Sequence, residues 1–263
     1  MINRVKEYWA DNVCGASDIK YPKYSREYFN EIETKRYATQ SAIFEFAQFT
    51  RYCGKKILEV GVGSGTDFIQ WVRAGSKAYG VDLTEEAVEH TKKRLEIYGL
   101  SAEEVKVGDA ENLPYPDNYF DVVFSWGVIH HTPNTIKALE EIIRVARIGG
   151  DIKIMVYNRG SLSAYAKYLY EGLFKGKPFN KSISRILYES QESIGTKAYT
   201  IKEMREILSW YPVKIKDISA RLTKHELGFT KRPILRYIPY IMACLLGFDK
   251  VGWFMTIDLE KWR

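Results

Sequence analysis

A short apolar strand that runs directly into a glycine-rich turn is the feature that most constrains how this chain folds. Residues 57–60 read Ile-Leu-Glu-Val, and Gly61, Gly63 and Gly65 then alternate along the turn. A backbone without Cβ atoms adopts left-handed or tight conformations and comes close to a ligand. A second predicted strand ends at Asp82. Its separation in sequence from the glycine-rich turn is roughly that from which a carboxylate reaches a ribose diol in nucleotide-binding α/β folds. The two segments predict a nucleoside site at one edge of a parallel sheet.

The glycine pattern differs from two common phosphate-binding loops. The run is Gly-x-Gly-x-Gly with Glu59 before it, whereas the dinucleotide fingerprint is Gly-x-Gly-x-x-Gly. No Lys-Ser or Lys-Thr pair follows the glycines, as a phosphate-cradling P-loop would need. The pattern therefore indicates a nucleoside that carries an amino-acid tail instead of a pyrophosphate, and S-adenosylmethionine is such a molecule.

Predicted strands and helices then alternate along the chain. We predict strands at 56–60, 78–82, 104–108, 120–125, 151–157, 213–219 and 252–259, and helices at 66–73, 85–97, 134–147 and 199–208. Such alternation requires a parallel sheet with right-handed crossovers, with ligands at the carboxyl ends of the strands. Asp109 and the pair Ser125 and Trp126 lie at two of these ends, so we expect them beside the same ligand.

Over roughly residues 55–158 the chain resembles class I (Rossmann-like) methyltransferases that use S-adenosylmethionine. Within that class it is similar to the small-molecule branch of quinone, sterol and glycan methyltransferases. Residues 146–150 read Ala-Arg-Ile-Gly-Gly where that branch usually has Leu-Arg-Pro-Gly-Gly, a change that affects turn rigidity and leaves the cofactor site intact. The resemblance implies an α/β fold with a seven-stranded, mostly parallel sheet flanked by helices.

The resemblance also implies how the rest of the chain is organised. Residues 1–54 form an N-terminal helical cap, residues 55–158 the cofactor-binding core, and residues 159–263 the last helix and strand hairpin, with substrate-side insertions at 159–198 and 220–250. In related methyltransferases a helical segment like the first one folds over the cofactor and closes one side of the active site. Arg36 and Tyr37 are therefore candidates for contact with the substrate, although packing against the core is an alternative.

The second insertion contains an apolar segment at 233–248. The segment is too short to span a bilayer and is interrupted by Pro239. A buried helix that covers the substrate pocket is our first interpretation. A surface that faces lipid or another subunit is the alternative.

The resemblance assigns a role to each residue of the cofactor site. Glu59 holds the amino group of the methionine tail, directly or through water, and the glycine loop lets the backbone approach that tail. Asp82 accepts from both ribose hydroxyls, because a carboxylate offers two oxygens to a vicinal diol. Asp109 accepts from the adenine amino group. Four further residues are expected to contact the adenine ring or the tail: Leu83, Ala110, Ser125 and Trp126.

Two adjacent histidines follow the strand nearest the expected donor methyl group. An imidazole titrates near neutrality, so His131 is the candidate general base, and a role in shaping the turn is the alternative. His130 is a candidate for contact with the substrate, and we expect His130 and His131 to point opposite ways, as neighbours at a strand end do. Tyr157 is a further catalytic candidate, and it and Arg159, after the fifth core strand, are placed to bind a hydroxyl or an anionic group of the substrate.

Charge and cysteine content limit the remaining function classes. The chain carries a net charge of +6, and residues 160–263 hold 18 Lys and Arg against 10 Asp and Glu. A basic substrate-side region suits an anionic small substrate, an anionic membrane surface or RNA, or is a solvated face. Cys14, Cys53 and Cys244 have no metal-ligand spacing, so we expect reduced structural thiols, no metal and a cytoplasmic protein, with peripheral membrane contact left open.

We therefore predict a methyltransferase that acts on a small-molecule or lipid- or glycan-linked acceptor, on oxygen or carbon. An RNA methyltransferase is the alternative, although the chain has neither an appended RNA-binding module nor an Asn/Asp-Pro-Pro-Tyr-like motif. A non-catalytic binding protein with the same fold is a third class. The sequence leaves the oligomeric state open.

Overall fold

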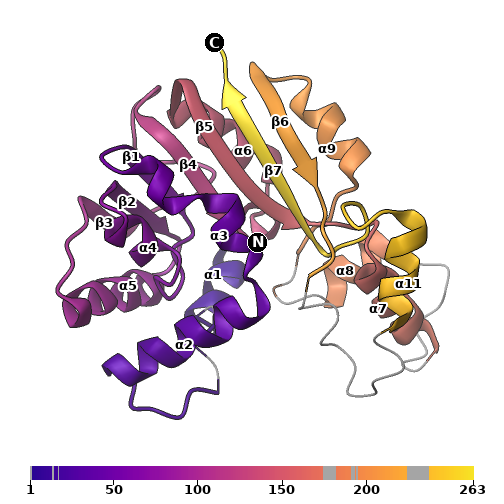
Figure 1. The fold of residues 1–263 in the computed structure, drawn as a ribbon, viewed down its shortest axis with the longest axis horizontal. Helices are drawn as coiled ribbons and strands as arrows, with labels where there is room; N and C mark the ends of the chain where they lie inside the picture. The colour runs from indigo at the N-terminus through magenta and orange to yellow at the C-terminus, as the bar shows by residue number, and fades with distance from the viewer. Residues whose placement is uncertain are drawn as a thin grey trace.

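In the computed structural model, which describes residues 2–13, 15–16, 18–173, 182–190, 193, 195–223 and 237–263, seven strands form one sheet. The strand order is β3-β2-β1-β4-β5-β7-β6 (Figure 1). The strands are β1 (Lys56–Val60), β2 (Lys77–Asp82), β3 (Glu104–Val107), β4 (Phe120–Trp126), β5 (Ala146–Tyr157), β6 (Val213–Ser219) and β7 (Phe254–Lys261). Strand β7 is antiparallel to both of its neighbours, β5 and β6, and the other strand pairs in this sheet are parallel. The predicted Rossmann-like α/β fold is therefore confirmed.

Helices cover both faces of the sheet (Figure 1). The described helices are α1 (Ile2–Asp11), α2 (Arg26–Thr39), α3 (Ala42–Ala47), α4 (Phe68–Arg73), α5 (Glu85–Tyr98), α6 (Thr135–Val145), α7 (Leu162–Leu173), α8 (Ile183–Ser190), α9 (Ile201–Leu208) and α11 (Tyr237–Leu246), with 3-10 turns η1 (Phe49–Tyr52) and η2 (Ile129–His131). Helices α7, α8 and α11 gather beyond one end of the sheet, away from α2 and α5 (Figure 1).

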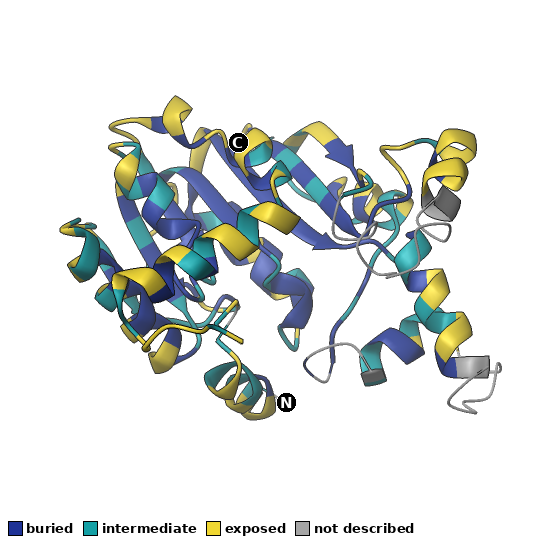
Figure 2. Ribbon diagram, turned by 60° about the horizontal axis from the view of Figure 1, so that its bottom comes forward, coloured by how far each residue is buried: buried dark blue, intermediate teal, exposed yellow. Residues whose placement is uncertain are grey.

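Two apolar cores sandwich the sheet, and its central strands β1, β4 and β5 are mostly buried between them (Figure 2). One core joins the sheet to α6 and α9, and the other joins it to α3, α4 and α5. Successive residues of β4 enter opposite cores: Val123 belongs to the first and Phe124 to the second. This alternation is the period of two that a strand imposes on its side chains, and it explains why a continuous apolar run predicts a strand covered on both faces.

Local hydrogen bonds begin two of the predicted helices where the sequence indicates. The side chain of Ser25 accepts from the backbone N–H of Tyr28 at the start of α2. At the start of α9, the side chain of Thr200 accepts from the backbone N–H of Glu203, whose carboxylate accepts in return from the Thr200 N–H. Each contact satisfies a backbone donor that a helix terminus leaves unpaired.

The helix predicted to run to residue 147 ends earlier, and β5 begins at Ala146. The carbonyls of Arg144 and Val145 accept from the N–H groups of Asn118 and Tyr119, at 3.0 and 2.9 Å. Ala146 then pairs with Phe120 of β4. Pairing with a neighbouring strand therefore overrides the helical spacing of this segment, which only the tertiary structure provides.

The interpretation of residues 233–248 as a buried cap is wrong for the part that the structure describes. In α11, Ala243 is buried, whereas Ile241 and Leu245 are 56% and 79% exposed. Residues 233–236 lie outside the described residues. None of the helices described is long and apolar enough to cross a membrane.

The expectation of reduced structural thiols is met in part, because two of the cysteines are free but lie at the surface. Cys53 and Cys244 are free and exposed, and Cys14 lies outside the described residues.

Candidate active site

A pocket of about 1010 Å³, including its open mouth, lies at the carboxyl ends of β1, β2, β3 and β4. Most of the residues predicted from the sequence line it: Glu59, Gly61, Gly63, Asp82, Leu83, Asp109, Ala110, Trp126, His131 and Arg36. Its remaining wall includes apolar side chains from α1 and the residues after it, namely Ile2, Val5, Trp9 and Val13. Sequence reasoning named none of these four, because a short amphipathic helix at a terminus carries no sign of the surface that it covers.

The glycine loop has the conformation that its composition predicts. Gly61, Gly63 and Gly65 have φ values of +83°, +54° and +72°. A Cβ on Gly61 would lie 2.2 Å from a methyl carbon of Val128, so the loop packs too closely for any side chain. Gly65 has a different use, since a Cβ there would meet Thr91 of α5 at 2.9 Å. This third glycine therefore brings the helix close and does not line the pocket.

Asp82 joins the loop to the end of β2. Its Oδ2 accepts from the N–H of Gly63 at 3.0 Å, and its Oδ1 accepts from the N–H and the hydroxyl of Thr84, both at 3.1 Å. Burial raises the pKa of the Asp82 carboxyl, and the hydrogen bonds from Gly63 and Thr84 oppose that increase. The carboxylate is thus held in one orientation at the pocket before any ligand binds.

Glu59 is 3% exposed at the end of β1, and its Oε2 accepts from the indole N–H of Trp71 at 2.9 Å. Burial raises the pKa of the Glu59 carboxyl well above its usual range, and the nearby charge of Asp67 adds to the effect. The Arg36 guanidinium lowers this pKa in part. A ligand cation beside Glu59 would favour the ionised form in the same way.

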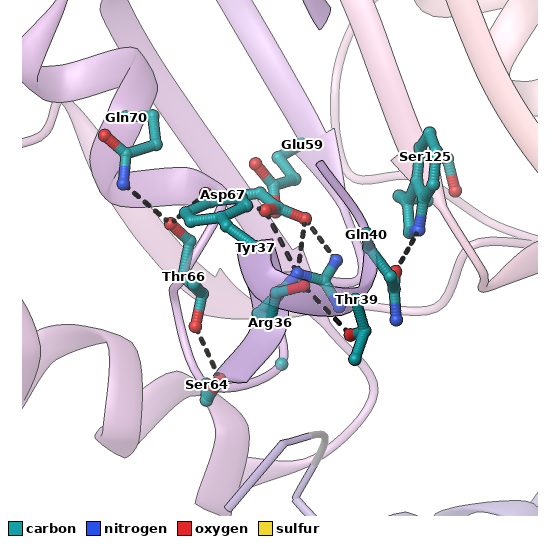
Figure 3. A network of polar contacts seen from close by, with 12 residues as sticks. Arg36, Tyr37, Thr39, Gln40, Glu59, Ser64, Thr66, Asp67, Gln70 and Ser125 are labelled. Atoms are coloured by element: carbon teal, nitrogen blue, oxygen red, sulfur yellow. Dashed lines mark hydrogen bonds and ion pairs between the residues drawn. The ribbon is translucent and has the colours of Figure 1, made fainter. Parts of the chain in front are cut away.

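Arg36 and Tyr37 connect α2 to the residue that follows the glycine loop (Figure 3). The guanidinium of Arg36 forms an ion pair with both oxygens of Asp67, with Nε at 3.1 Å from each. The Tyr37 hydroxyl lies 3.0 Å from the carbonyl of Thr66 and 2.9 Å from Asp67 Oδ1. Arg36 also lines the pocket, whereas Tyr37 is not among the described lining residues.

Asp109, after β3, and Ser125 and Trp126, at the end of β4, are held by different hydrogen bonds. Asp109, only partly buried, accepts from the backbone N–H of Glu111 at 2.9 Å. Trp126 donates its indole N–H to Gln40 at 2.9 Å (Figure 3). Ser125 is fully buried and donates to the carbonyl of Val60 at 3.1 Å. Ser125 therefore joins β4 to β1 and is not one of the lining residues described.

His130 and His131 do not point opposite ways, contrary to expectation. They lie in η2, a 3-10 turn beyond the end of β4, where side chains do not alternate as in a strand, and their ring centroids are 4.2 Å apart. His131 lines the pocket, and the ring of Trp9 in α1 lies edge-on to it at 5.1 Å. His130 is fully buried, and burial lowers its pKa well below the usual range, with further contributions from His131 and Lys197.

Tyr157 and Arg159 lie behind the pocket and are not among the described residues that line it. The Tyr157 ring is stacked on Trp253 at 4.4 Å and lies 4.0 Å from the ring of His130. Arg159 forms an ion pair with Glu203 and donates to the hydroxyl of Ser184 at 2.8 Å. Ring packing therefore holds Tyr157 in place. The ion pair with Glu203, in the first turn of α9, holds Arg159.

The residues present fit S-adenosylmethionine. The pocket combines a backbone cradle at Gly61, where a Cβ would clash, with carboxylates at the ends of three consecutive strands. Glu59 would hold the ammonium group of the tail, Asp82 the ribose hydroxyls and Asp109 the adenine amino group. No group of three or more His, Cys, Asp or Glu side chains among the described residues could hold a metal ion.

Comparison with known proteins agrees with this geometry. Residues 58–154 match the family described as methyltransferase domain. The geranyl diphosphate C-methyltransferase of Streptomyces coelicolor, whose crystal structure contains S-adenosylhomocysteine, has the same fold: the TM-score is 0.65 at 14% identity, over 99% of this chain and 97% of that one. Residues 58–154 are therefore similar to a methyltransferase domain, and the chain has a Rossmann-like fold.

Two curated relatives are similar in sequence. The phthiotriol/phenolphthiotriol dimycocerosates methyltransferase of Mycobacterium tuberculosis is 37% identical over 99 residues, which is 37% of this chain and 36% of that protein. This chain thus aligns with little more than a third of that relative's length. The demethylmenaquinone methyltransferase of Staphylococcus aureus is 26% identical over 222 residues, covering 76% of this chain and 90% of that protein.

A matched pair of glycine substitutions tests the close packing of the loop. Gly61→Ala should destabilise the protein by about 1–2 kcal/mol through its positive φ and by about 1–3 kcal/mol more through overpacking against Val128. Gly54→Ala is the control, because Gly54 also has a positive φ (+74°) but nothing lies within 4 Å of its Cβ position. Urea unfolding of both variants measures the difference. Equal losses of stability would contradict the close packing of Gly61.

Proposed function

We propose that this protein transfers a methyl group from S-adenosylmethionine to a small-molecule or lipid- or glycan-type acceptor, on oxygen or carbon. The observation that carries the proposal is the placement of Glu59, Asp82 and Asp109 around one pocket with the glycine cradle between the first two. A nucleoside with an amino-acid tail presents an ammonium group, a diol and an exocyclic amine, and each of these donates to a carboxylate. Three acceptors in that order match three donors in the ligand.

Methyl transfer depends on alignment of the two reactants more than on covalent participation by the protein. Bound S-adenosylmethionine supplies an electrophilic methyl group on a sulfonium, and its transfer is an in-line displacement. The protein holds the reactants and excludes water, which together provide much of the rate. A base is needed only when the acceptor carries a proton, and His131 in the pocket wall has the side chain for that role.

The acceptor class is inferred from the pocket wall and from the relatives. The side chains of Ile2, Val5 and Trp9 make one wall apolar beside His131, so an acceptor with an apolar part fits there. The relatives are named for phthiotriol and phenolphthiotriol dimycocerosates, demethylmenaquinone and geranyl diphosphate, all of which are lipids or small molecules. The RNA alternative rests only on the basic charge of residues 160–263, and no feature of the described pocket favours it.

Removal of the Asp82 carboxylate tests the ribose assignment. Asp82→Ala should weaken the binding of S-adenosylhomocysteine by about 2–3 kcal/mol, the value of charge-assisted hydrogen bonds lost from a buried diol. Titration calorimetry on the folded variant measures this change.

Asp121→Ala is the matched control for that experiment. Asp121 lies at the start of β4, far along the sheet from the pocket, and accepts from the N–H of Lys56 and from Arg147. Its removal should lower stability and leave ligand affinity unchanged. Wild-type affinity in Asp82→Ala would remove the assignment.

The raised pKa of Glu59 predicts a pH dependence of ligand binding. In the ligand-free protein, burial keeps Glu59 protonated at pH values where an ordinary glutamate is ionised. The cost that this group adds to folding is complete above the raised pKa, decreases as pH falls from the raised to the ordinary pKa, and is absent below the ordinary pKa. The ammonium group of the ligand needs the carboxylate, so affinity should fall, with proton release on binding, as pH drops through the raised pKa.

Calorimetry in buffers of different ionisation enthalpy counts the released protons. Glu59→Gln should reduce the pH dependence but not abolish it, because burial also raises the pKa of Asp82, which remains. A wild-type affinity that does not change between about pH 5 and pH 8 would show that Glu59 does not hold the ammonium group.

The acceptor class is tested by transfer from S-adenosylmethionine with a labelled methyl group. The protein is incubated with a small-molecule and lipid extract and, separately, with bulk tRNA and rRNA, with Asp82→Ala as the inactive control. We expect label in the extract, and the carbon shift of the labelled methyl group distinguishes attachment to oxygen from attachment to carbon. Label only in RNA would favour the alternative, and no transfer to either would favour a binding protein.

A further inference from the structure

Helix α11 exposes apolar side chains around most of its circumference. Its sequence, Tyr-Ile-Pro-Tyr-Ile-Met-Ala-Cys-Leu-Leu, contains no charged residue. Burial is described for residues 240–246 of this helix, and of these Ala243 alone is buried. Six large apolar side chains of the helix and the turn after it are between 39% and 79% exposed: Tyr240, Ile241, Met242, Leu245, Leu246 and Phe248. A group of neighbouring apolar side chains in water indicates a surface that binds a partner.

This helix lies at the end of the sheet where the pocket is located (Figure 1). The N–H of Leu162, which follows β5, donates to the carbonyl of Val251, which follows α11, at 3.1 Å. Strand β5 is parallel to β4, so its carboxyl end is at the same edge of the sheet as the strand ends beside the pocket. A partner bound through α11 therefore lies on the side of the molecule that contains the pocket.

The part of the chain that leads into α11 is basic. Residues 224–236 contain four basic residues and one acidic residue. The last of the four, Arg236, directly precedes the helix, and Asp249 and Lys250 follow it at exposed positions. An uncharged apolar helix joined to a basic segment suits an anionic lipid surface, because the acyl chains accept the apolar side chains and the headgroup phosphates attract the cations.

Two other arrangements suit these features less well. A symmetric dimer uses the same patch on both subunits, so a dimer formed through α11 would bring the basic segments of the two copies together, and like charges oppose association. A membrane-spanning arrangement fails on length. The ten residues of α11 rise about 15 Å as a helix, whereas the hydrocarbon core of a bilayer is about 30 Å thick. The helix can lie along a membrane surface but cannot cross it.

We propose that α11 is a membrane-binding helix that lies along the surface of an anionic bilayer. Ile241 and Leu245, one turn apart on the same face, enter the outer part of the acyl layer. Tyr240 lies at the level of the headgroups, where amphipathic rings are favoured. This inference goes beyond the proposed function, because membrane binding does not require methyl transfer. It places the pocket end of the molecule near the lipid phase, in which an apolar acceptor of the proposed class dissolves.

Sedimentation with lipid vesicles tests the proposal. The full chain is mixed with vesicles of phosphatidylcholine alone, or of phosphatidylcholine and phosphatidylglycerol in equal parts. We expect binding to the anionic vesicles, much weaker binding to the neutral ones, and a loss of affinity as salt is raised, because salt screens the attraction between exposed charges. Ile241→Glu should weaken binding to the anionic vesicles by about 10-fold or more, because one aliphatic side chain no longer enters the apolar layer.

Ile148→Glu is the matched control for this substitution. Ile148 is also 56% exposed, and it lies near the start of β5, at the end of that strand away from α11. Both variants change the net charge equally and keep the buried core, so both should remain folded and only Ile241→Glu should lose vesicle binding. Equal losses in the two variants, or no binding of the wild type to anionic vesicles, would overturn the proposal.

Sedimentation equilibrium without lipid examines the other occupant of this surface. We expect the same oligomeric state for the wild type and Ile241→Glu. A dimer that Ile241→Glu dissociates and Ile148→Glu does not would assign the surface to a second copy of the chain, and the membrane proposal would be wrong.

Fluorescent probes on two cysteines locate the helix in the membrane without a charged substitution. Cys244 is in α11 and Cys53 precedes β1, at the opposite end of the sheet from the pocket, and both are free and exposed. Each is labelled alone, with the other two cysteines of the chain changed to serine. Lipids that carry a nitroxide on the acyl chain should quench the probe on Cys244 and leave the probe on Cys53 bright. Equal quenching of the two probes, or no quenching of either, would contradict the proposed orientation.

Membrane binding and methyl transfer can fail separately. A protein that transfers methyl groups to a soluble acceptor but binds no anionic vesicle would overturn this inference and leave the proposed function intact. A protein that binds vesicles through α11 but transfers no methyl group would support this inference and contradict the proposed function.

Discussion

The ion pair between Arg36 and Asp67 is the contact on which the geometry of the site depends. Asp67 lies two residues after Gly65, and Arg36 extends from α2, so one buried interaction fixes α2 against the core beside the glycine loop (Figure 3). Around it, the fully buried Arg94 of α5 bonds to Glu33 of α2 at 2.7 Å and to Thr66 at 2.8 Å. Because each charge is desolvated, removal of one partner would leave the other uncompensated. The pocket is thus shaped before a ligand enters.

The same desolvation gives the pocket its selectivity. Burial raises the pKa values of Glu59 and Asp82, so negative charge on these carboxyls is unfavourable in the empty site, and a cation or a set of donors favours their ionised form. A phosphate would add a further negative charge there, and this explains physically why a glycine loop preceded by an acid suits an amino-acid tail rather than a pyrophosphate. The helix α1 adds the apolar wall, with Trp9 against His131, and so separates the reacting centre from water.

The core of the site could be predicted from the sequence because its signals are local. A glycine between an apolar strand and a helix, or an acid at a strand end, can be interpreted from the few residues around it in the sequence. Parallel topology then brings the strand ends to one edge of the sheet. Predictions failed where the deciding contact is distant. The helix end at Val145 depends on pairing with β4, and the orientation of His130 and His131 depends on a 3-10 turn that follows the strand. The exposure of α11 depends on which residues pack against it, and an apolar run in the sequence does not identify those residues.

The sequence alone therefore determined the class of fold and the strand ends that meet at the pocket, and it predicted a ligand whose donors match Glu59, Asp82 and Asp109. Tertiary structure decided which side chains complete the pocket, namely Trp9 and its neighbours from α1. It also decided that Ser125, Tyr157 and Arg159 bond or pack behind the lining. The physical reason is the separation in sequence between the residues that interact. Backbone conformation and side-chain alternation are set by neighbours in the chain, whereas burial and ion pairs are set by residues that only folding brings into contact.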